Sequence, residues 1–341
     1  KQAQVLSLIH PSAQLQDLQG CDLVIEAVFE NRALKAQVTQ EAQAVMNAAG
    51  VFATNTSTLP ISGLAQASVR PAKFVGLHFF SPVDKMRLVE IIKGAQTDDE
   101  TLARAYDYVL AIGKTPIVVN DSRGFFTSRV FGTYVMEGAA MLGEGIPAAL
   151  IEHAALAAGM PVGPLAVMDE TSLSLYEHVI EQTRSDFAAE GKTYVTSAGE
   201  KIVERMVNEF KRAGRAAGAG FYDYPSAGPK RLWSGLKQHF EKPLTGEPLA
   251  LQLAMNQRLL YRQAIETARC LQENVLTSAH DANIGSIFGI GFPAWTGGAL
   301  QYVFSEGLEA FQANCQTLAQ RHGKGFELSP EVMACLKKHR P

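Results

Sequence analysis

One histidine and one glutamate stand at the ends of two short apolar segments of this chain. His78 lies within residues 76–83, and Glu90 ends the segment 88–90. Imidazole titrates near neutral pH, and a carboxylate beside it orients the ring and stabilises the imidazolium that forms when the ring takes a proton. The two side chains could therefore act together as a general base toward a hydroxyl group. The residues alone also allow a structural role, because a histidine flanked by apolar residues is more often a core residue.

Other polar residues follow predicted strands. The tripeptide Asn-Thr-Ser at residues 55–57 ends one predicted strand, and open α/β sheets bind ligands beyond the carboxyl ends of their strands. Glu30 and Lys35 flank a strand-to-helix turn, from which both could reach a cofactor. Two plainer interpretations stay open: residues 55–57 are a polar turn before a helix, and Lys35 is a solvated residue on a helix.

The sequence patterns around these residues predict an α/β sheet in the first third of the chain. Short, nearly continuous apolar runs are typical of buried parallel strands, and apolar residues at three- and four-residue spacing indicate a helix over residues 31–50. A capping box at residues 97–100 starts another helix. Strands are predicted at residues 23–29, 51–55, 74–79, 88–92 and 116–119.

The architecture changes after Asp121, where strand signals fade and long helical patterns follow. Proline and glycine interrupt every period between residues 224 and 249, which indicates a linker with one short helix near residues 232–240. The predicted division is an α/β domain at residues 1–121, a first helical domain at 122–224, the linker at 225–249 and a second helical domain at 250–341.

The two predicted helical domains are similar to each other. Gly159-Met160-Pro161 is matched by Gly291-Phe292-Pro293, with a three-residue insertion relative to the offset of 129 positions that the other matched residues share. A constant offset over several positions favours an internal duplication. At an offset of 129 positions, Arg129, Glu137, Leu142, Glu144 and Glu152 are matched by Arg258, Glu266, Leu271, Glu273 and Asp281.

The composition excludes several functional classes. The 341 residues include 47% hydrophobic residues and carry a formal net charge of -3, so they offer no basic field for nucleic acid. The four cysteines lie far apart without a Cys-x-x-Cys motif, which argues against a metal site and fits a reducing compartment. No apolar run reaches the roughly 20 residues that a membrane span needs. A small-molecule enzyme is the class that remains.

Four motifs in order, at residues 55–57, 76–83, 88–90 and 124–126, together resemble the L-3-hydroxyacyl-CoA dehydrogenase family of fatty acid β-oxidation. The helical repeats, with Gly-Phe-Tyr-Asp-Tyr at residues 220–224 between them, resemble the branch found in α-subunits of bacterial multifunctional fatty acid oxidation complexes. This resemblance implies NAD as the cofactor, an acyl-CoA substrate and a cytoplasmic location. It also implies an enoyl-CoA hydratase domain in the full-length protein and a thiolase subunit as a partner.

The resemblance also implies roles for single residues in oxidising L-3-hydroxyacyl-CoA to 3-ketoacyl-CoA. His78 is expected to take the hydroxyl proton, and Glu90 to orient the imidazole. Ser81 and Ser128 stand where many members of the family have asparagine, and Ser128 therefore offers no amide to the substrate. The expected substrate contacts are Ser57, Ser81 and Ser128, and the expected cofactor contacts are Ala27, Glu30, Lys35, Asn55 and Ser57.

In this family a glycine-rich turn binds the pyrophosphate of the cofactor. That turn is expected upstream of Lys1, so the resemblance implies a truncated Rossmann-like parallel sheet followed by two tandem all-α domains of the family's C-terminal type. Residues 5–9 are then the remnant of a strand that has lost its neighbour. We expect residues 1–19 to be displaced or disordered, or the sheet edge to be covered by another chain, and NAD binding to be weak or absent.

Two alternatives to a 3-hydroxyacyl-CoA dehydrogenase remain. The chain could be a non-catalytic module for acyl-CoA binding or assembly of a β-oxidation complex, with Ser128 marking a lost activity. A different two-domain dehydrogenase, acting on small hydroxy acids, is disfavoured by the tandem repeat.

Overall fold

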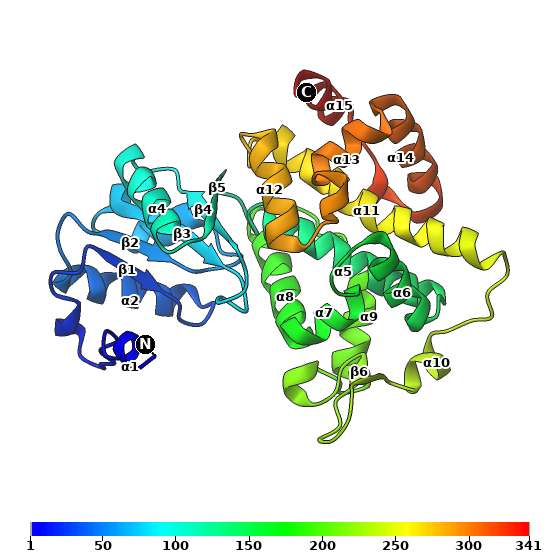
Figure 1. Ribbon diagram of the computed structural model, residues 1–341, viewed down its shortest axis with the longest axis horizontal. Helices are drawn as coiled ribbons and strands as arrows, with labels where there is room; N and C mark the ends of the chain where they lie inside the picture. Colours follow the sequence, from blue (N-terminus) through cyan, green and yellow to red (C-terminus); the bar gives the residue numbers. More distant parts are fainter. Residues whose placement is uncertain (1, 341) are drawn as a thin grey trace. The chain divides into compact units, whose positions relative to one another are not determined.

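The computed structural model describes residues 2–340 and separates into two compact units (Figure 1). Lys1 and Pro341, at the outer ends of the predicted α/β and second helical domains, lie outside the described residues. The α/β unit comprises the chain up to Phe126 together with Asn274–Thr277. The helical unit comprises Thr127–Glu273 and the chain from Ser278 onward.

Five strands form the sheet of the α/β unit, and they lie in the sheet in chain order. Three neighbouring pairs are parallel, whereas β3 and β4 are antiparallel. Residues 80–87 between these two strands are too few for the crossover of a dozen or more residues that a parallel connection needs. The α/β sheet is thus parallel-dominated, with one antiparallel pair. The strands are β1 (Leu23–Glu26), β2 (Val51–Thr54), β3 (Phe74–Phe79), β4 (Leu88–Lys93) and β5 (Thr115–Asn120).

Helices cover both faces of this sheet (Figure 1). On one face, alternate residues of β2, β3 and β4 form a buried apolar cluster with Ala105 and Val109 of α4 (Asp99–Ala111). Asp98, not Thr97, accepts the capping hydrogen bond of α4, so the helix begins one residue later than the predicted capping box. The remaining helices of the unit are α2 (Arg32–Val45), α3 (Ile61–Leu64), η2 (Ala65–Ala67) and η3 (Pro71–Lys73).

The N-terminal segment is not part of the sheet. It contains a short helix, α1 (Gln2–Leu6), and a 3₁₀ turn, η1 (Leu15–Leu18), and β1 forms the edge of the sheet. The prediction of a strand remnant at residues 5–9 is therefore wrong, while the expected displacement of this segment is what the structure shows. Val5 and Ile9 are 56% and 61% exposed. Without a neighbouring strand, a helical turn satisfies backbone hydrogen bonds locally.

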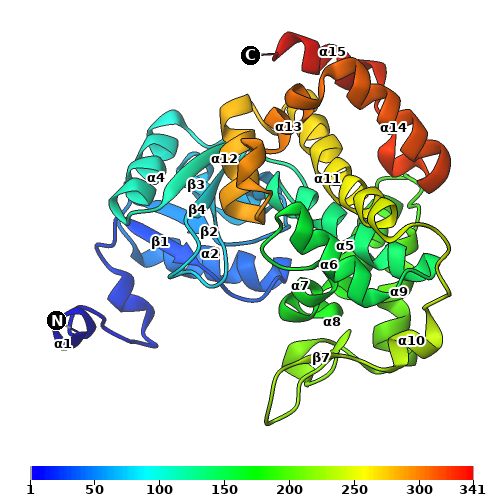
Figure 2. The ribbon, with the colours of Figure 1, turned by 45° about the vertical axis from the view of Figure 1, so that its right-hand side comes forward.

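The helical unit contains two series of helices, which follow each other in the chain (Figure 2). The first is α5 (Thr127–Glu144), α6 (Ala148–Ala158), α7 (Pro164–Thr171), α8 (Leu173–Ala189) and α9 (Ala198–Glu204). The second is α11 (Pro248–Gln272), α12 (Ala279–Ile290), α13 (Ala299–Glu306), α14 (Leu308–His322) and α15 (Pro330–Lys338), with turns η6 (Ala294–Thr296) and η7 (Lys324–Phe326). Between them lie η4 (Arg205–Glu209), η5 (Arg215–Ala217), the hairpin of β6 (Tyr222–Asp223) and β7 (Arg231–Leu232), and α10 (Gly235–His239).

Reciprocal ion pairs join the two series where α5 packs against α11. Arg129 of α5 pairs with Glu266 of α11 and with Glu273, the residue directly after α11, each at 2.6 Å. Arg258 of α11 makes the equivalent pairs at 2.6 Å with the two glutamates of α5, which are Glu137 and Glu144. These residues are the charged positions matched at the offset of 129. Reciprocity of this kind is the property of a two-fold interface, here between two segments of one chain.

For one of the matched positions, the structurally equivalent residue is not the one that the offset of 129 gives. Glu152 accepts hydrogen bonds from the backbone N–H groups of Leu165 and Ala166 at the start of α7. In the second series Asn283 makes the equivalent contacts to the start of α13, whereas the offset of 129 points to Asp281. Helix α12 begins 131 positions after α6, so the register has already moved by two residues at this point.

Candidate active site

His78 and Glu90 face each other across the antiparallel pair of β3 and β4. Their Cα atoms are register partners, so both side chains leave the sheet on the same face. His78 Nδ1 lies 3.0 Å from Glu90 Oε2, and the two side chains are 9% and 0% exposed. Because the carboxylate accepts, Nδ1 carries the hydrogen and Nε2 is left as the basic nitrogen. This is the tautomer that a general base requires.

The second oxygen of Glu90 is also held in place. Oε1 accepts a hydrogen bond of 3.0 Å from the backbone N–H of Phe126. The preceding residues, Gly124 and Phe125, have φ values of 71° and 51°, and this left-handed turn presents the N–H to Glu90. A bulky side chain rarely adopts such a φ value. The aromatic rings of Phe125 and Phe80 lie 6.2 Å and 4.5 Å from the His78 ring.

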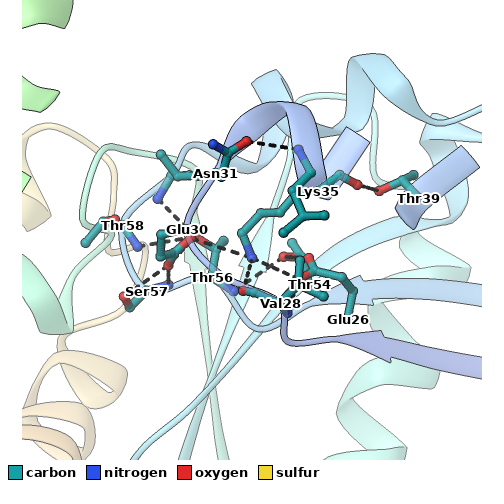
Figure 3. A network of polar contacts seen from close by, with 12 residues as sticks. Glu26, Val28, Glu30, Asn31, Lys35, Thr39, Thr54, Thr56, Ser57 and Thr58 are labelled. Atoms are coloured by element: carbon teal, nitrogen blue, oxygen red, sulfur yellow. Dashed lines mark hydrogen bonds and ion pairs between the residues drawn. The ribbon is translucent and has the colours of Figure 1, made fainter. Parts of the chain in front are cut away.

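A second polar cluster lies at the carboxyl ends of β1 and β2 (Figure 3). The Glu30 carboxylate accepts hydrogen bonds from the Thr56 hydroxyl at 2.9 Å and from the Ser57 N–H at 2.8 Å. The Ser57 hydroxyl also donates to it, at 3.2 Å. The predicted residues Glu30 and Ser57 are therefore brought together, at the edge where open α/β sheets bind ligands.

Lys35 is buried, contrary to the interpretation of a solvated helix residue. Its ammonium lies 2.9 Å from Glu26 Oε1, 3.2 Å from the Val28 carbonyl oxygen and 3.6 Å from Glu30 Oε2, and its side chain is 2% exposed. Glu26 was not among the predicted site residues, because it stands within the apolar run of a predicted strand. A glutamate inside such a run was the available signal, since an acidic residue is rarely fully buried unless it is paired.

The Asn55 side chain is held next to the residue that follows His78. Its side-chain oxygen accepts the Phe79 N–H at 2.9 Å, which fixes the end of β3 next to the histidine. Asp121 stabilises the neighbouring loop, because its carboxylate accepts the N–H groups of Ile61 and Ser62 at the start of α3. Neither contact was predictable from the sequence, because each joins residues far apart in the chain.

The remaining predicted site residues are Ala27, Ser81 and Ser128. Ala27 follows β1 directly and is exposed, and Ser81 lies exposed in the connection after β3. Ser128 lies in the first turn of α5 and therefore belongs to the helical unit. Within residues 2–340 no group of three side chains could hold a metal ion, and no helix of this range is long and apolar enough to cross a membrane.

Fold and site together define a known class of dehydrogenase. Residues 1–122 match the NAD-binding domain of 3-hydroxyacyl-CoA dehydrogenase, and residues 124–224 match the C-terminal domain of the same enzyme. The (S)-3-hydroxybutyryl-CoA dehydrogenase PaaH1 from Ralstonia eutropha is 33% identical over 66% of this chain and 78% of its own, with a TM-score of 0.59. The chain belongs to the 3-hydroxyacyl-CoA dehydrogenase family.

Two further proteins resemble a larger part of the chain. The fatty acid oxidation complex subunit alpha of Vibrio cholerae is 34% identical over 339 residues, which cover 96% of this chain and 46% of that protein. The chain thus spans about half the length of the curated relatives it matches. A 3-hydroxybutyryl-CoA dehydrogenase from Escherichia coli has the same fold over 99% of this chain and 86% of its own, with a TM-score of 0.78 and 21% identity.

Proposed function

We propose that this chain is the dehydrogenase part of a fatty acid oxidation complex α-subunit and oxidises L-3-hydroxyacyl-CoA to 3-ketoacyl-CoA. One observation supports the proposal most strongly, namely the buried contact of 3.0 Å between His78 Nδ1 and Glu90 Oε2. The family establishes the class of reaction, and this contact supplies the base that the reaction needs.

His78 Nε2 takes the proton of the 3-hydroxyl group as the alcohol is oxidised. The Glu90 carboxylate holds the ring through Nδ1 and stabilises the positive charge that the ring then carries. NAD, when bound, supplies the hydride acceptor. The buried position of the pair keeps the effective dielectric constant low, which strengthens the interaction between carboxylate and imidazolium.

The carboxyl ends of β1 and β2 fit the nicotinamide side of NAD. They carry hydroxyl, amide and charged groups, and a dinucleotide binds at this edge in doubly wound sheets. Ser57, Ser81 and Ser128 are the proposed substrate contacts. The residues proposed to hold the cofactor are Ala27, Glu30, Lys35, Asn55 and Ser57.

We further propose that a polypeptide of these 341 residues binds NAD weakly. Its sequence contains no Gly-x-Gly-x-x-Gly turn between a strand and a helix, the element that binds the pyrophosphate. Calorimetric titration should therefore show little heat with NAD. A dissociation constant in the micromolar range would contradict this inference.

The proposal extends to the whole protein in which these residues occur. The resemblance of the motifs implies an enoyl-CoA hydratase domain elsewhere in the full-length protein and a thiolase subunit as its partner, and the similar Vibrio cholerae protein is a subunit of a fatty acid oxidation complex. The same resemblance implies a place in the cytoplasm of a bacterium. Co-purification of the full-length protein with a thiolase would test the partnership.

The full-length protein should oxidise NADH when acetoacetyl-CoA is added, which absorbance at 340 nm follows. His78→Gln should lower kcat by about 10²–10⁴, the usual contribution of a general base. The control is His153→Gln, since His153 lies exposed on α6, and its activity should equal that of the wild type. Activity that survives in His78→Gln would exclude the histidine from its role. A wild type that binds acyl-CoA but oxidises no NADH would favour the non-catalytic module.

A further inference from the structure

Glu26 is a buried carboxylate with three hydrogen-bond donors around it (Figure 3). It is the last residue of β1, and its side chain is 1% exposed. Its Oε1 accepts the Val28 N–H at 2.6 Å and the Lys35 ammonium at 2.9 Å. Its Oε2 accepts the Thr54 hydroxyl at 2.7 Å. Glu26 therefore joins β2, the turn after β1 and helix α2.

Lys35 depends on this carboxylate. It lies in the first turns of α2, where the helix dipole disfavours a positive charge, and its side chain is 2% exposed. A buried ammonium is costly unless it is paired. Glu26 provides the shortest contact, and Glu30 lies farther away at 3.6 Å. Removal of the Glu26 charge would leave the ammonium free to move toward Glu30 and solvent.

Glu30 continues the same network toward the ligand side. Its side chain is 28% exposed, and its carboxylate accepts from the Ser57 N–H at 2.8 Å. The order of contacts is thus Glu26, Lys35, Glu30 and Ser57, from the interior of the unit to its surface. Glu30 is the more exposed carboxylate of this network, whereas the side chains of Glu26 and Lys35 are almost fully enclosed.

We propose that Glu26 is a positioning residue for cofactor binding, which acts through Lys35 on Glu30 and Ser57. This inference rests on the proposed function, since it assigns these contacts to the NAD edge of the sheet. The Val28 N–H contact gives Glu26 a second effect, because it fixes the turn that carries Ala27 and Phe29. Glu26 itself touches no ligand and takes no part in proton transfer.

The test uses the full-length protein and the assay with NADH and acetoacetyl-CoA. Glu26→Gln keeps the size of the side chain and removes its charge. We expect KM for NADH to rise about tenfold and kcat to change less than about threefold, because an interaction that holds the cofactor equally before and during the reaction affects KM alone. The matched control is Glu41→Gln on the exposed side of α2, with wild-type constants.

A double-mutant cycle with Lys35→Met separates positioning from general destabilisation. If Glu26 acts through Lys35, the double variant should show about the KM of the more damaged single variant; independent effects would multiply to about a hundredfold. Multiplied effects, or an unchanged KM in Glu26→Gln, would overturn the role of Glu26 and leave the proposed function intact. An inactive wild type would instead remove the proposed function and this inference with it. If Glu26→Gln does not fold, the same double-mutant cycle is measured with Glu26→Asp. This variant keeps the negative charge but has a side chain shorter by one methylene group, so its contact with Lys35 is weakened.

Discussion

Replacement of Glu90 by glutamine would move the proton of the His78 ring from Nδ1 to Nε2, with little change in the size of the side chain at position 90. The glutamine oxygen can still accept the Phe126 N–H, which donates to Glu90 Oε1 at 3.0 Å. The amide nitrogen then faces His78 Nδ1, where the carboxylate oxygen lay at 3.0 Å. Two donors cannot face each other, so the ring proton moves to Nε2. The nitrogen that should accept the substrate proton is then already protonated.

The size of the effect follows from the distance. Opposite unit charges 3.0 Å apart attract by about 5 kcal/mol at an effective dielectric constant of about 20. This stabilisation is available to the imidazolium of the wild type and absent from Glu90→Gln. At about 1.4 kcal/mol for each factor of ten, kcat should fall by between three and four powers of ten. A wrong tautomer alone has an effect of comparable size in other enzymes.

The measurement is kcat for NADH oxidation with acetoacetyl-CoA in the full-length protein. Glu100→Gln is the control, because Glu100 lies in the first turn of α4 with its side chain 68% exposed. Thermal unfolding shows whether Glu90→Gln keeps its fold. A folded variant with more than about a tenth of wild-type kcat would refute the assignment of the carboxylate as the partner of the base.

Three further predictions concern the helical unit. Arg258→Met should lower the free energy of unfolding by about 3 kcal/mol, since buried Glu137 loses its ion pair of 2.6 Å and keeps the longer one to Arg262 at 3.5 Å; an unchanged denaturant midpoint would contradict this. Burial raises the pKa of Asp169, so the folded protein keeps a proton there after the unfolded chain has released it, and the resulting stabilisation is lost as the pH rises through the raised value. The unfolding free energy of the wild type relative to Asp169→Asn should therefore be higher near pH 4, close to the ordinary pKa of an aspartate, than near pH 8, and an equal difference at both would contradict the raised pKa. Burial also raises the pKa of Cys315 to about 12, so iodoacetamide should label this thiol only after unfolding, as peptide mass spectrometry would show.

Much of the fold was predictable because its signals are local. Each of the five strands lies within or close to its predicted range, and α2 begins directly after Asn31, whose side chain caps it. Apolar periodicity and helix caps act over a few residues, so the sequence carries them without knowledge of distant partners. The segment at residues 5–9 was predicted wrongly because a strand needs a neighbouring strand, which is not a local property.

The residues of the candidate site were predictable from the sequence, but the contacts between them were not. His78, Glu90, Glu30 and Ser57 could be singled out by type and by their places at strand ends. Sequence could not show that Glu26 lies beneath Lys35, because that contact joins a strand to a helix nine positions later and depends on both being buried. Nor could it show that Phe126 donates to Glu90, since this hydrogen bond spans 36 positions.

The sequence by itself determined the elements, the internal repeat and the histidine and glutamate that could do chemistry. The tertiary structure alone decided their partners. The antiparallel register of β3 and β4 places His78 opposite Glu90, and a shift by one residue would turn one of the two side chains to the other face of the sheet. Burial then makes each polar contact depend on geometry, because an enclosed charge is tolerated only where a partner lies within hydrogen-bond distance.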